Sequence, residues 1–453
     1  MFLEQNPWWS YGDVPGLLAR SVARPFAEAL FKRLSEEKVR RFQLILGPRR
    51  VGKTTCMYQT VKSLLQAGVR PTHIKWIRLD HPMLMGISLG NIVGNLMKAE
   101  ASEQPTYLFL DEITYADNWD KWLKTFYDDN WPVHLVGTSS STAALKTGRA
   151  ESGVGRWEEQ YLPPYMFSEY LDLLGVSIEL SDPAQTLAET LSQINPNSPE
   201  WANLARYRQH YLFTGGFPEL LLATSMEVNQ QDAILHSQQI LRSDAVERAI
   251  YKDIPQVFRI ENPRLLERLL YTLAGSITGI LSPTTVKTQL EMSQPTLDRY
   301  LHYLEQSYLI LTLQNYSNRE GAKQARGRKV YFVDGAVRNA ALQRGVLPLS
   351  NPEEMGSLLE NLVAGQLYGL SRQTDSRLYY WRDGNSEVDF VYDHPTQPLA
   401  FLIGSSMTHH RSGLAAIQRR YPRLVNRCYM VSPDASFVRP EENGGIGSVP
   451  LDF

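Results

Sequence analysis

One stretch constrains this chain more than any other, Gly47-Pro-Arg-Arg-Val-Gly-Lys-Thr54, which lies between the apolar run 42–46 and a helical pattern over 53–66. It matches G-x-x-x-x-G-K-[ST], a loop whose backbone N–H groups surround phosphates where a strand passes into a helix. Lys53 is predicted to reach the β- and γ-phosphates, and Thr54 to ligate Mg²⁺. A chance glycine turn is the alternative. The predicted ATP-binding residues are Gly47, Pro48, Arg49, Arg50, Val51, Gly52, Lys53, Thr54 and Thr55.

The complementary half of such a site is an acidic residue at the end of a neighbouring strand. The apolar run 107–110 ends in Asp111 and Glu112. Asp111 is predicted to hold Mg²⁺ through water, and Glu112 to polarise the attacking water as general base. A third strand, 133–136, leads to Thr138, whose hydroxyl is expected to reach the γ-phosphate or that water. The plainer alternatives are solvated carboxylates and an ordinary turn threonine.

The alternation of strands and helices predicts an α/β fold. Strand-like runs at 42–46, 74–79, 107–110 and 133–136 are separated by helical stretches, the order of a parallel sheet, and a helix is expected over 17–38. We expect four domains: a phosphate-loop ATPase core (1–160), a helical lid (161–260), a winged helix (261–335) and a C-terminal α/β domain (336–453).

Composition narrows the function classes. With 46 basic and 48 acidic residues, a net charge of -2 creates no global attraction to nucleic acid or membrane. The two cysteines, Cys56 and Cys428, lie far apart, which favours a reducing compartment over a disulfide scaffold or zinc site. No signal peptide or membrane span is visible, so we expect a cytoplasmic protein. Trp8 and Trp9 are either a docking tail or part of the protein's own core.

Four stretches carry a resemblance to a known family: GPRRVGKTT, LFLDEITYADNW, the GTSSS strand end, and Gly155-Arg156 before LPPYMFSEY. Through them the chain resembles the uncharacterised prokaryotic ATPases of the AAA+ superfamily. In that family a C-terminal region combines a winged helix with a PD-(D/E)XK nuclease-like fold. The resemblance implies that Pro218, in Thr214-Gly-Gly-Phe-Pro218, packs near the nucleotide as part of a lid. It also suggests Arg156 as an arginine finger or sensor, although a surface arginine is an equal alternative. A finger that acts on a neighbour's γ-phosphate implies a homo-oligomer.

The region 264–315 gives three helical stretches, followed by strand-like runs at 309–313 and 329–333, which is a winged-helix order. If its second capped helix enters a DNA major groove, the side chains near the helix start would be Gln294, Thr296, Arg299 and His302. The wing, 319–329, carries five basic residues and one acidic residue, suited to phosphate contacts. Protein docking is an equal alternative for this module.

The C-terminal region resembles the nuclease-like fold through Glu360-Asn361 on a helix and Glu387-Val-Asp389 on a strand. Active members would continue with an acid and a lysine, but Leu402 and Gly404 stand at those places. Glu360 and Asp389 would then bind a cation only poorly, and we expect a domain that binds or scaffolds without cleaving.

Three functions follow as hypotheses. The first is an ATP-hydrolysing protein that couples its nucleotide state to the winged-helix and nuclease-like modules, with DNA, protein partners or further copies of the chain as partners. The second is a nucleotide-gated switch that turns over slowly and acts through protein interaction. The third, an ATP-dependent nuclease, is disfavoured by Leu402 and Gly404.

Overall fold

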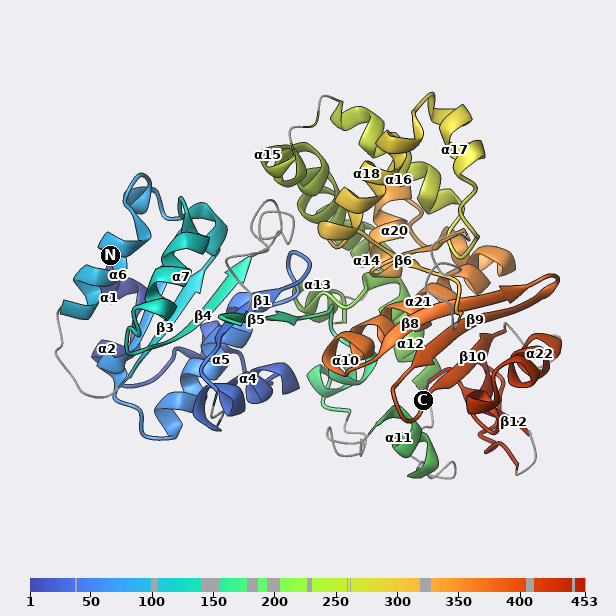
Figure 1. Cartoon of the computed structure of the whole chain (residues 1–453), viewed down its shortest axis with the longest axis horizontal. Helices are drawn as coiled ribbons and strands as arrows, with labels where there is room; N and C mark the ends of the chain where they lie inside the picture. The colour runs from blue at the N-terminus through green and yellow to red at the C-terminus, as the bar shows by residue number, and fades with distance from the viewer. Residues whose placement is uncertain are drawn as a thin grey trace. The chain divides into compact units, whose positions relative to one another are not determined.

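The computed structural model (Figure 1) divides into two compact units. The first comprises residues 1–163 and 253–259, and the second comprises 164–252 and 260–453. The described residues are 1–36, 39–98, 105–139, 155–176, 186–193, 204–225, 230–258, 260, 262–317, 327–404, 411–441 and 445–452. The segment 253–259 is thus part of the first unit although the chain on both sides of it belongs to the second.

A parallel five-stranded sheet in the order β2-β3-β4-β1-β5 forms the centre of the first unit (Figure 1). Its strands are β1 (Phe42–Leu46), β2 (Ile74–Arg78), β3 (Thr106–Asp111), β4 (Val133–Ser139) and β5 (Trp157–Tyr161). The first four are buried along nearly their whole length, as strands of a parallel sheet covered by helices on both faces usually are. The predicted α/β fold with a parallel sheet is confirmed. The fifth strand, Trp-Glu-Glu-Gln-Tyr, was missed because its charged residues hide the pattern.

The helices of this unit are α1 (Phe2–Gln5), α2 (Trp8–Tyr11), α3 (Gly16–Ala19), α4 (Pro25–Glu36), α5 (Lys53–Gln66), α6 (Leu89–Lys98), α7 (Trp119–Asp128) and α15 (Ile254–Val257). The single helix expected over 17–38 is instead α3 and α4, because Arg20 takes a positive φ of 60° and Pro25 begins a new helix. Residues 37 and 38 lie outside the described residues.

The two adjacent tryptophans near the N-terminus belong to the protein's own core. Trp8 is fully buried, and the indole N–H groups of Trp8 and Trp9 donate to the Ile74 carbonyl at 3.0 and 2.8 Å. Asn6 adds bonds in both directions with the backbone of Trp76. The N-terminal segment therefore covers β2, an edge of the sheet.

The second unit begins with helices and ends in a mixed sheet. Its helices are α10 (Phe167–Leu173), α11 (Leu187–Gln193), α12 (Leu204–Thr214), α13 (Pro218–Ser225), α14 (Gln230–Leu241), α16 (Pro263–Gly275), α17 (Pro283–Leu290), α18 (Gln294–Gln306), α20 (Gly335–Leu342), α21 (Pro352–Gln373) and α22 (Ser412–Arg420). Two π-helical segments, Arg242–Glu247 and Ala249–Asp253, follow α14 in the chain.

The strands of the second unit are β6 (Ile310–Leu313), β7 (Lys329–Phe332), β8 (Arg377–Asp383), β9 (Ser386–Asp393), β10 (Leu399–Ile403), β11 (Cys428–Ser432) and β12 (Ile446–Pro450). β6 and β7 form an antiparallel pair. The other five form a sheet in the order β12-β11-β10-β9-β8, antiparallel from β8 to β10 and parallel from β10 to β12.

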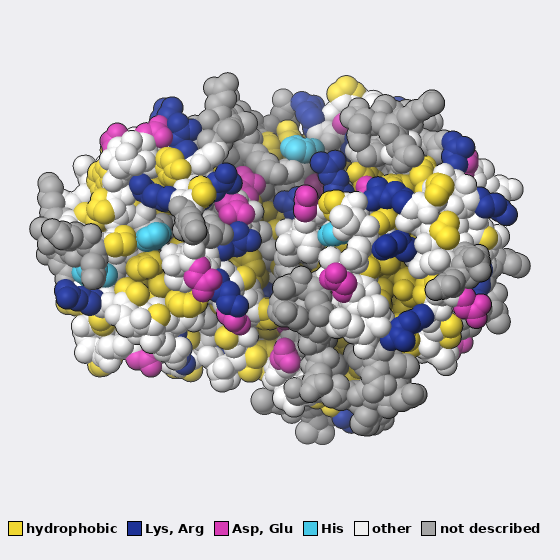
Figure 2. Space-filling model, turned by 60° about the horizontal axis from the view of Figure 1, so that its bottom comes forward, with side chains coloured by type: hydrophobic (Ala, Val, Ile, Leu, Met, Phe, Trp, Pro, Cys, Tyr) yellow, Lys and Arg dark blue, Asp and Glu magenta, His cyan; other side chains and the backbone are white. Residues whose placement is uncertain are grey.

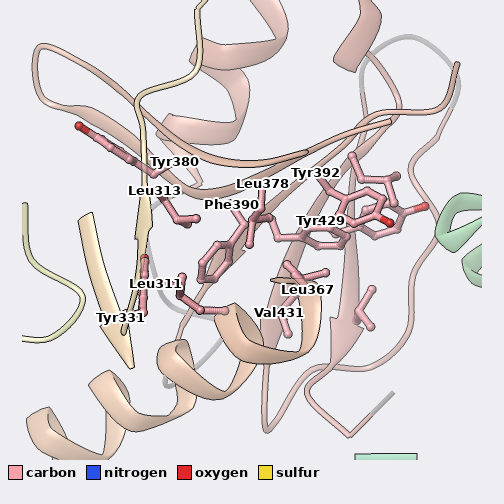
Figure 3. Packing of buried hydrophobic residues seen from close by; sticks show 14 of the residues in the cluster. Leu311, Leu313, Tyr331, Leu367, Leu378, Tyr380, Phe390, Tyr392, Tyr429 and Val431 are labelled. Carbon is pink, nitrogen blue, oxygen red and sulfur yellow. The ribbon is translucent and has the colours of Figure 1, made fainter. Parts of the chain in front are cut away.

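One hydrophobic core joins the β6–β7 pair to the C-terminal sheet. Figure 3 shows Leu311, Leu313 and Tyr331 of the pair packed with Leu367 of α21 and with residues of the sheet. The Tyr331 and Phe390 ring centroids are 5.5 Å apart. The chain after β6 also pairs with β8, since the amides of Tyr316 and Tyr380 bond to carbonyls across the two segments. The β6–β7 pair is therefore integrated into the C-terminal sheet's core.

On the face drawn in Figure 2, basic and acidic side chains are interspersed, consistent with the near-balanced charge. Among the helices in the described ranges, none has both the length and the apolar character needed to cross a bilayer.

Candidate nucleotide site

The phosphate loop connects β1 to α5 and depends on close backbone approach at Gly47. A Cβ atom at this position would lie 2.2 Å from the Leu162 carbonyl oxygen, because the chain leaving β5 hydrogen-bonds back to Leu46. Gly52 has a φ of 92°, which non-glycine residues rarely adopt. The buried Arg24, which lies before α4 in the chain, supports the loop by donating to the Val51 carbonyl at 3.0 Å. The two motif glycines thus have steric and conformational reasons to be glycine.

Lys53 is the first residue of α5, and its side chain folds back over the loop. Its Nζ donates to the carbonyls of Gly47 and Pro48 at 2.9 and 2.8 Å. Burial lowers the pKa of Lys53 to about 8, although the neighbouring Glu112 carboxylate opposes the shift. The ammonium is held by neutral carbonyls, which a phosphate group could replace.

Asp111 ends β3 and gathers two hydroxyl groups around its carboxylate. Thr54 Oγ1 lies 3.2 Å from each carboxylate oxygen, and Thr138 donates to Asp111 Oδ1 at 2.7 Å. Burial raises the pKa of Asp111 to about 6, against the opposing effect of these hydrogen bonds. The Thr54 and Asp111 oxygens are hard ligands of the kind that Mg²⁺ prefers.

Thr138 bonds to both acidic residues at the end of β3, and its predicted reach to the γ-phosphate or the attacking water stays a prediction. Its hydroxyl donates to Asp111, and its oxygen accepts from the Glu112 backbone amide at 2.9 Å. In this structure Thr138 therefore positions the two acidic residues. Glu112 itself has a φ of 55°, in the left-handed region that costs a non-glycine residue about 1–3 kcal/mol. Strain of this kind clusters at functional sites.

Asp253, a residue that sequence reasoning missed, contacts the phosphate loop. Arg49 Nε and Nη2 bond to its two carboxylate oxygens at 2.6 and 2.8 Å, a bidentate pair. The side chains are 19% and 9% exposed, so the pair is largely desolvated. The pKa of Arg49 is raised because the hydrogen bond and charge of Asp253, together with Glu112, outweigh the opposing effect of burial. The partners are 204 residues apart, and no local pattern joins them.

The family resemblance also suggests roles at the nucleotide for Arg156 and Pro218, and the structure shows the local surroundings of each. Arg156 precedes β5, and its carbonyl accepts the amide of Phe42, the first residue of β1. It therefore lies at the amino ends of the strands, opposite the phosphate loop, where it pairs with Asp128 at 2.8 Å. A role for Arg156 in another subunit's site stays a prediction.

Pro218 begins α13 in the second unit. The preceding turn is fixed within that unit, because the Gly216 amide donates to Asp334 at 2.8 Å and its carbonyl accepts from the Tyr165 amide at 2.7 Å. A Cβ at Gly215 would lie 2.6 Å from the Asp334 carboxylate. The glycines of this motif therefore serve packing within the second unit, and an approach of Pro218 to the nucleotide stays a prediction.

The predicted DNA-reading residues lie on α18. Arg299 and His302 are exposed. The Gln294 side chain donates to Asp298 at 3.1 Å, and the Thr296 backbone amide donates to the Ser293 hydroxyl that caps the helix. Most of the predicted wing lies outside the described residues. Lys329, counted among its basic residues, is a correction: it is buried and paired with carboxylates, so it is not available for a backbone phosphate.

Comparisons with known proteins agree with this geometry. Residues 39–171 match the model of an AAA domain, whereas 205–347 and 355–446 match two domains of unknown function, DUF8612 and DUF4143. Residues 39–171, which include the strands of the first unit's sheet, are thus similar to an AAA domain. An uncharacterised protein of Methanocaldococcus jannaschii is 26% identical over 357 residues, covering 78% of this chain and 72% of that protein. One of Haemophilus influenzae is 22% identical over 394 residues, covering 84% and 88%.

The chain is also similar to solved structures, with low TM-scores. The Thermotoga maritima RuvB Holliday junction branch migration motor is 17% identical, with a TM-score of 0.31, and the match covers 67% of this chain and 94% of RuvB. The Aeropyrum pernix ORC2 protein is 12% identical, with a TM-score of 0.41, and the match covers 74% and 98%.

Proposed function

We propose that this protein is a Mg²⁺-dependent ATPase whose nucleotide state is transmitted to the second unit. The observation that carries the proposal is the grouping at the carboxyl ends of β1, β3 and β4. There the loop lysine, the Thr54 hydroxyl and the buried Asp111 carboxylate converge. The chemistry of these donors fits both a triphosphate and a hard divalent cation.

Each residue has a distinct task in this proposal. Lys53 exchanges its carbonyl partners for phosphate oxygens and supplies positive charge in a buried setting. Thr54 and Asp111 would hold Mg²⁺, which neutralises phosphate charge when bound. Thr138 fixes the Asp111 carboxylate and the Glu112 backbone, and Glu112 accepts the proton of the attacking water.

Transmission to the second unit would follow the chain through Asp253. A triphosphate in the loop competes with the Asp253 carboxylate for Arg49, because both are anions that a guanidinium binds through parallel hydrogen bonds. Displacing Asp253 moves a segment whose neighbours on both sides belong to the second unit. This contact also favours the second candidate function, a slowly cycling switch that acts through partner proteins.

The proposal has two extensions. The first is DNA binding through the α18 side chains Gln294, Thr296, Arg299 and His302. The second is a homo-oligomer in which Arg156 serves the nucleotide site of a neighbouring subunit. The exposed Asp298 among the α18 residues opposes phosphate contact. The ATP-dependent nuclease has the least support, because Leu402 and Gly404 supply neither the acid nor the lysine of an active site.

The test is steady-state ATP hydrolysis by wild type, Lys53→Ala and Glu112→Gln, each with and without single-stranded and duplex DNA, with oligomer mass measured in parallel. The proposal expects turnover by wild type and loss of at least about 100-fold in both variants. Stimulation by DNA would support a nucleic-acid partner. Tight ATP binding without turnover in wild type would replace the ATPase with the switch, and absence of ATP binding would overturn both.

A further inference from the structure

A second group of charged side chains lies buried in the second unit, remote in sequence from the phosphate loop. Lys329, the first residue of β7, places its Nζ 2.6 Å from Glu387, 3.0 Å from Asp389 and 3.3 Å from Glu360. Glu360 lies on α21, and the other two carboxylates lie on β9. We call Lys329, Glu360, Glu387 and Asp389 the ammonium cluster.

The cluster is closed off from water at its centre. The side chain of Lys329 is 3% exposed, and those of Asp389 and Glu360 are 10% and 16% exposed. Two further groups satisfy the carboxylates: the Tyr331 hydroxyl donates to Glu360 at 2.7 Å, and the Ile403 amide donates to Asp389 at 2.9 Å. Buried carboxylates are retained only with such partners, because an unpaired buried charge is very costly.

The ammonium has the position and contacts of a bound cation. A single positive atom contacts oxygens from three carboxylates on two secondary-structure elements, as a divalent ion would. Within the described part of the chain, no group of three or more His, Cys, Asp or Glu side chains is arranged to hold a metal ion. Contact with the three carboxylates raises the pKa of Lys329 despite its burial, so the group stays charged.

We propose that the Lys329 ammonium is the resident cation of this cluster, held by Glu360, Glu387 and Asp389 in place of a divalent metal ion. The consequence is structural. Because Lys329 begins β7, the ion cluster ties the β6–β7 pair to α21 and β9. Asn361, the residue after Glu360, reinforces the same junction by bonding both the amide and the carbonyl of Phe332 in β7.

The experiment measures Mn²⁺ binding by electron paramagnetic resonance, using the full chain without nucleotide and carrying Asp111→Asn so that the phosphate loop loses its predicted metal ligand. This background is expected to show no Mn²⁺ site that depends on Asp389. Adding Lys329→Met keeps an unbranched side chain one atom shorter than lysine but removes the ammonium, and should raise Mn²⁺ affinity at least about tenfold by freeing three carboxylates. Adding Asp389→Asn to that variant should abolish the gain.

Two results overturn the proposal. One is a Mn²⁺ site in the Asp111→Asn protein that Asp389→Asn removes, since the cluster would then take a metal despite the lysine. The other is a folded Lys329→Met protein with no gain in Mn²⁺ affinity. If Lys329→Met does not fold, amine labelling of Lys329 in the wild-type chain decides the question. Protection that Mn²⁺ leaves unchanged supports the proposal, and labelling that increases with Mn²⁺ contradicts it.

Discussion

The two units each bury a lysine near carboxylates, with opposite electrostatic results. In the first unit Lys53 contacts backbone carbonyls, and burial lowers its pKa to about 8. In the second unit Lys329 contacts three carboxylates, which raise its pKa. The difference shows that burial alone does not decide the role of a lysine. A lysine on neutral partners can exchange them for a ligand, whereas one on charged partners is fixed.

Removing each lysine should give the largest contrast. Lys329→Met leaves the largely buried carboxylates of Glu360 and Asp389, and the one-third exposed Glu387, without their cation. The free energy of opening of β9, measured by amide hydrogen exchange, should therefore fall by about 3–5 kcal/mol. Lys53→Met removes a charge that burial disfavours, so the corresponding value for β1 should fall by less than about 1 kcal/mol, or rise. Equal losses in the two units would break the comparison.

The next effect concerns Asp111 and pH. Its pKa of about 6 in the folded protein exceeds the ordinary value of 3.8, so the proton favours the folded state. This stabilisation is complete below pH 3.8 and is lost as pH rises through 6. Between about pH 4 and 6 the nucleotide-free protein should therefore lose about 1–3 kcal/mol, measured by hydrogen exchange of β3. Asp111→Asn should lack this loss and be correspondingly more stable at pH 7.5, while ATP hydrolysis disappears.

The control for Asp111 is Glu28→Gln, which removes an exposed carboxylate of α4 that pairs with Lys32. This variant should retain the wild-type pH dependence, because exposed ion pairs contribute little. A flat pH profile in the wild-type protein would show that Asp111 does not store this free energy.

A third test sharpens the comparison at the phosphate loop itself. Asp253→Asn removes the charge that pairs with Arg49, so a nucleotide no longer has to displace a carboxylate from that guanidinium. ATP should therefore bind about tenfold more tightly, measured by isothermal titration calorimetry. Asp128→Asn, which removes the partner of Arg156 at the opposite edge of the sheet, is the matched control and should leave affinity unchanged. Weaker ATP binding by Asp253→Asn would assign Asp253 to holding Arg49 in a binding-competent position.

The smallest effect concerns the backbone of Glu112. Because glycine adopts a φ of 55° without strain, Glu112→Gly should stabilise β3 by about 0.5–1 kcal/mol in hydrogen exchange. Glu112→Gln keeps the strain and should leave stability unchanged, whereas both variants lose hydrolysis. A loss of stability in Glu112→Gly would mean that contacts of the side chain outweigh its backbone strain.

The sequence predicted the parts of this site that follow from local patterns. The strand 42–46, the loop from Gly47 to Thr54 and the acid ending the strand at Asp111 are all readable, because strand, turn and helix signals stand next to one another. Asp253 and Lys329 were not recognised. Their partners lie 204 and up to 60 residues away, and a charge pairing over such a distance leaves no periodicity. Nor could β5 be recognised, because three of its five residues are polar.

The discontinuous make-up of the first unit has a consequence for biosynthesis. Arg49 leaves the ribosome 204 residues before Asp253, which at about 5–20 residues per second is a delay of roughly 10–40 s. During that interval the nascent phosphate loop lacks its acidic partner. If the loop binds a nucleotide as proposed, one that reaches it during synthesis meets no competing carboxylate from Asp253.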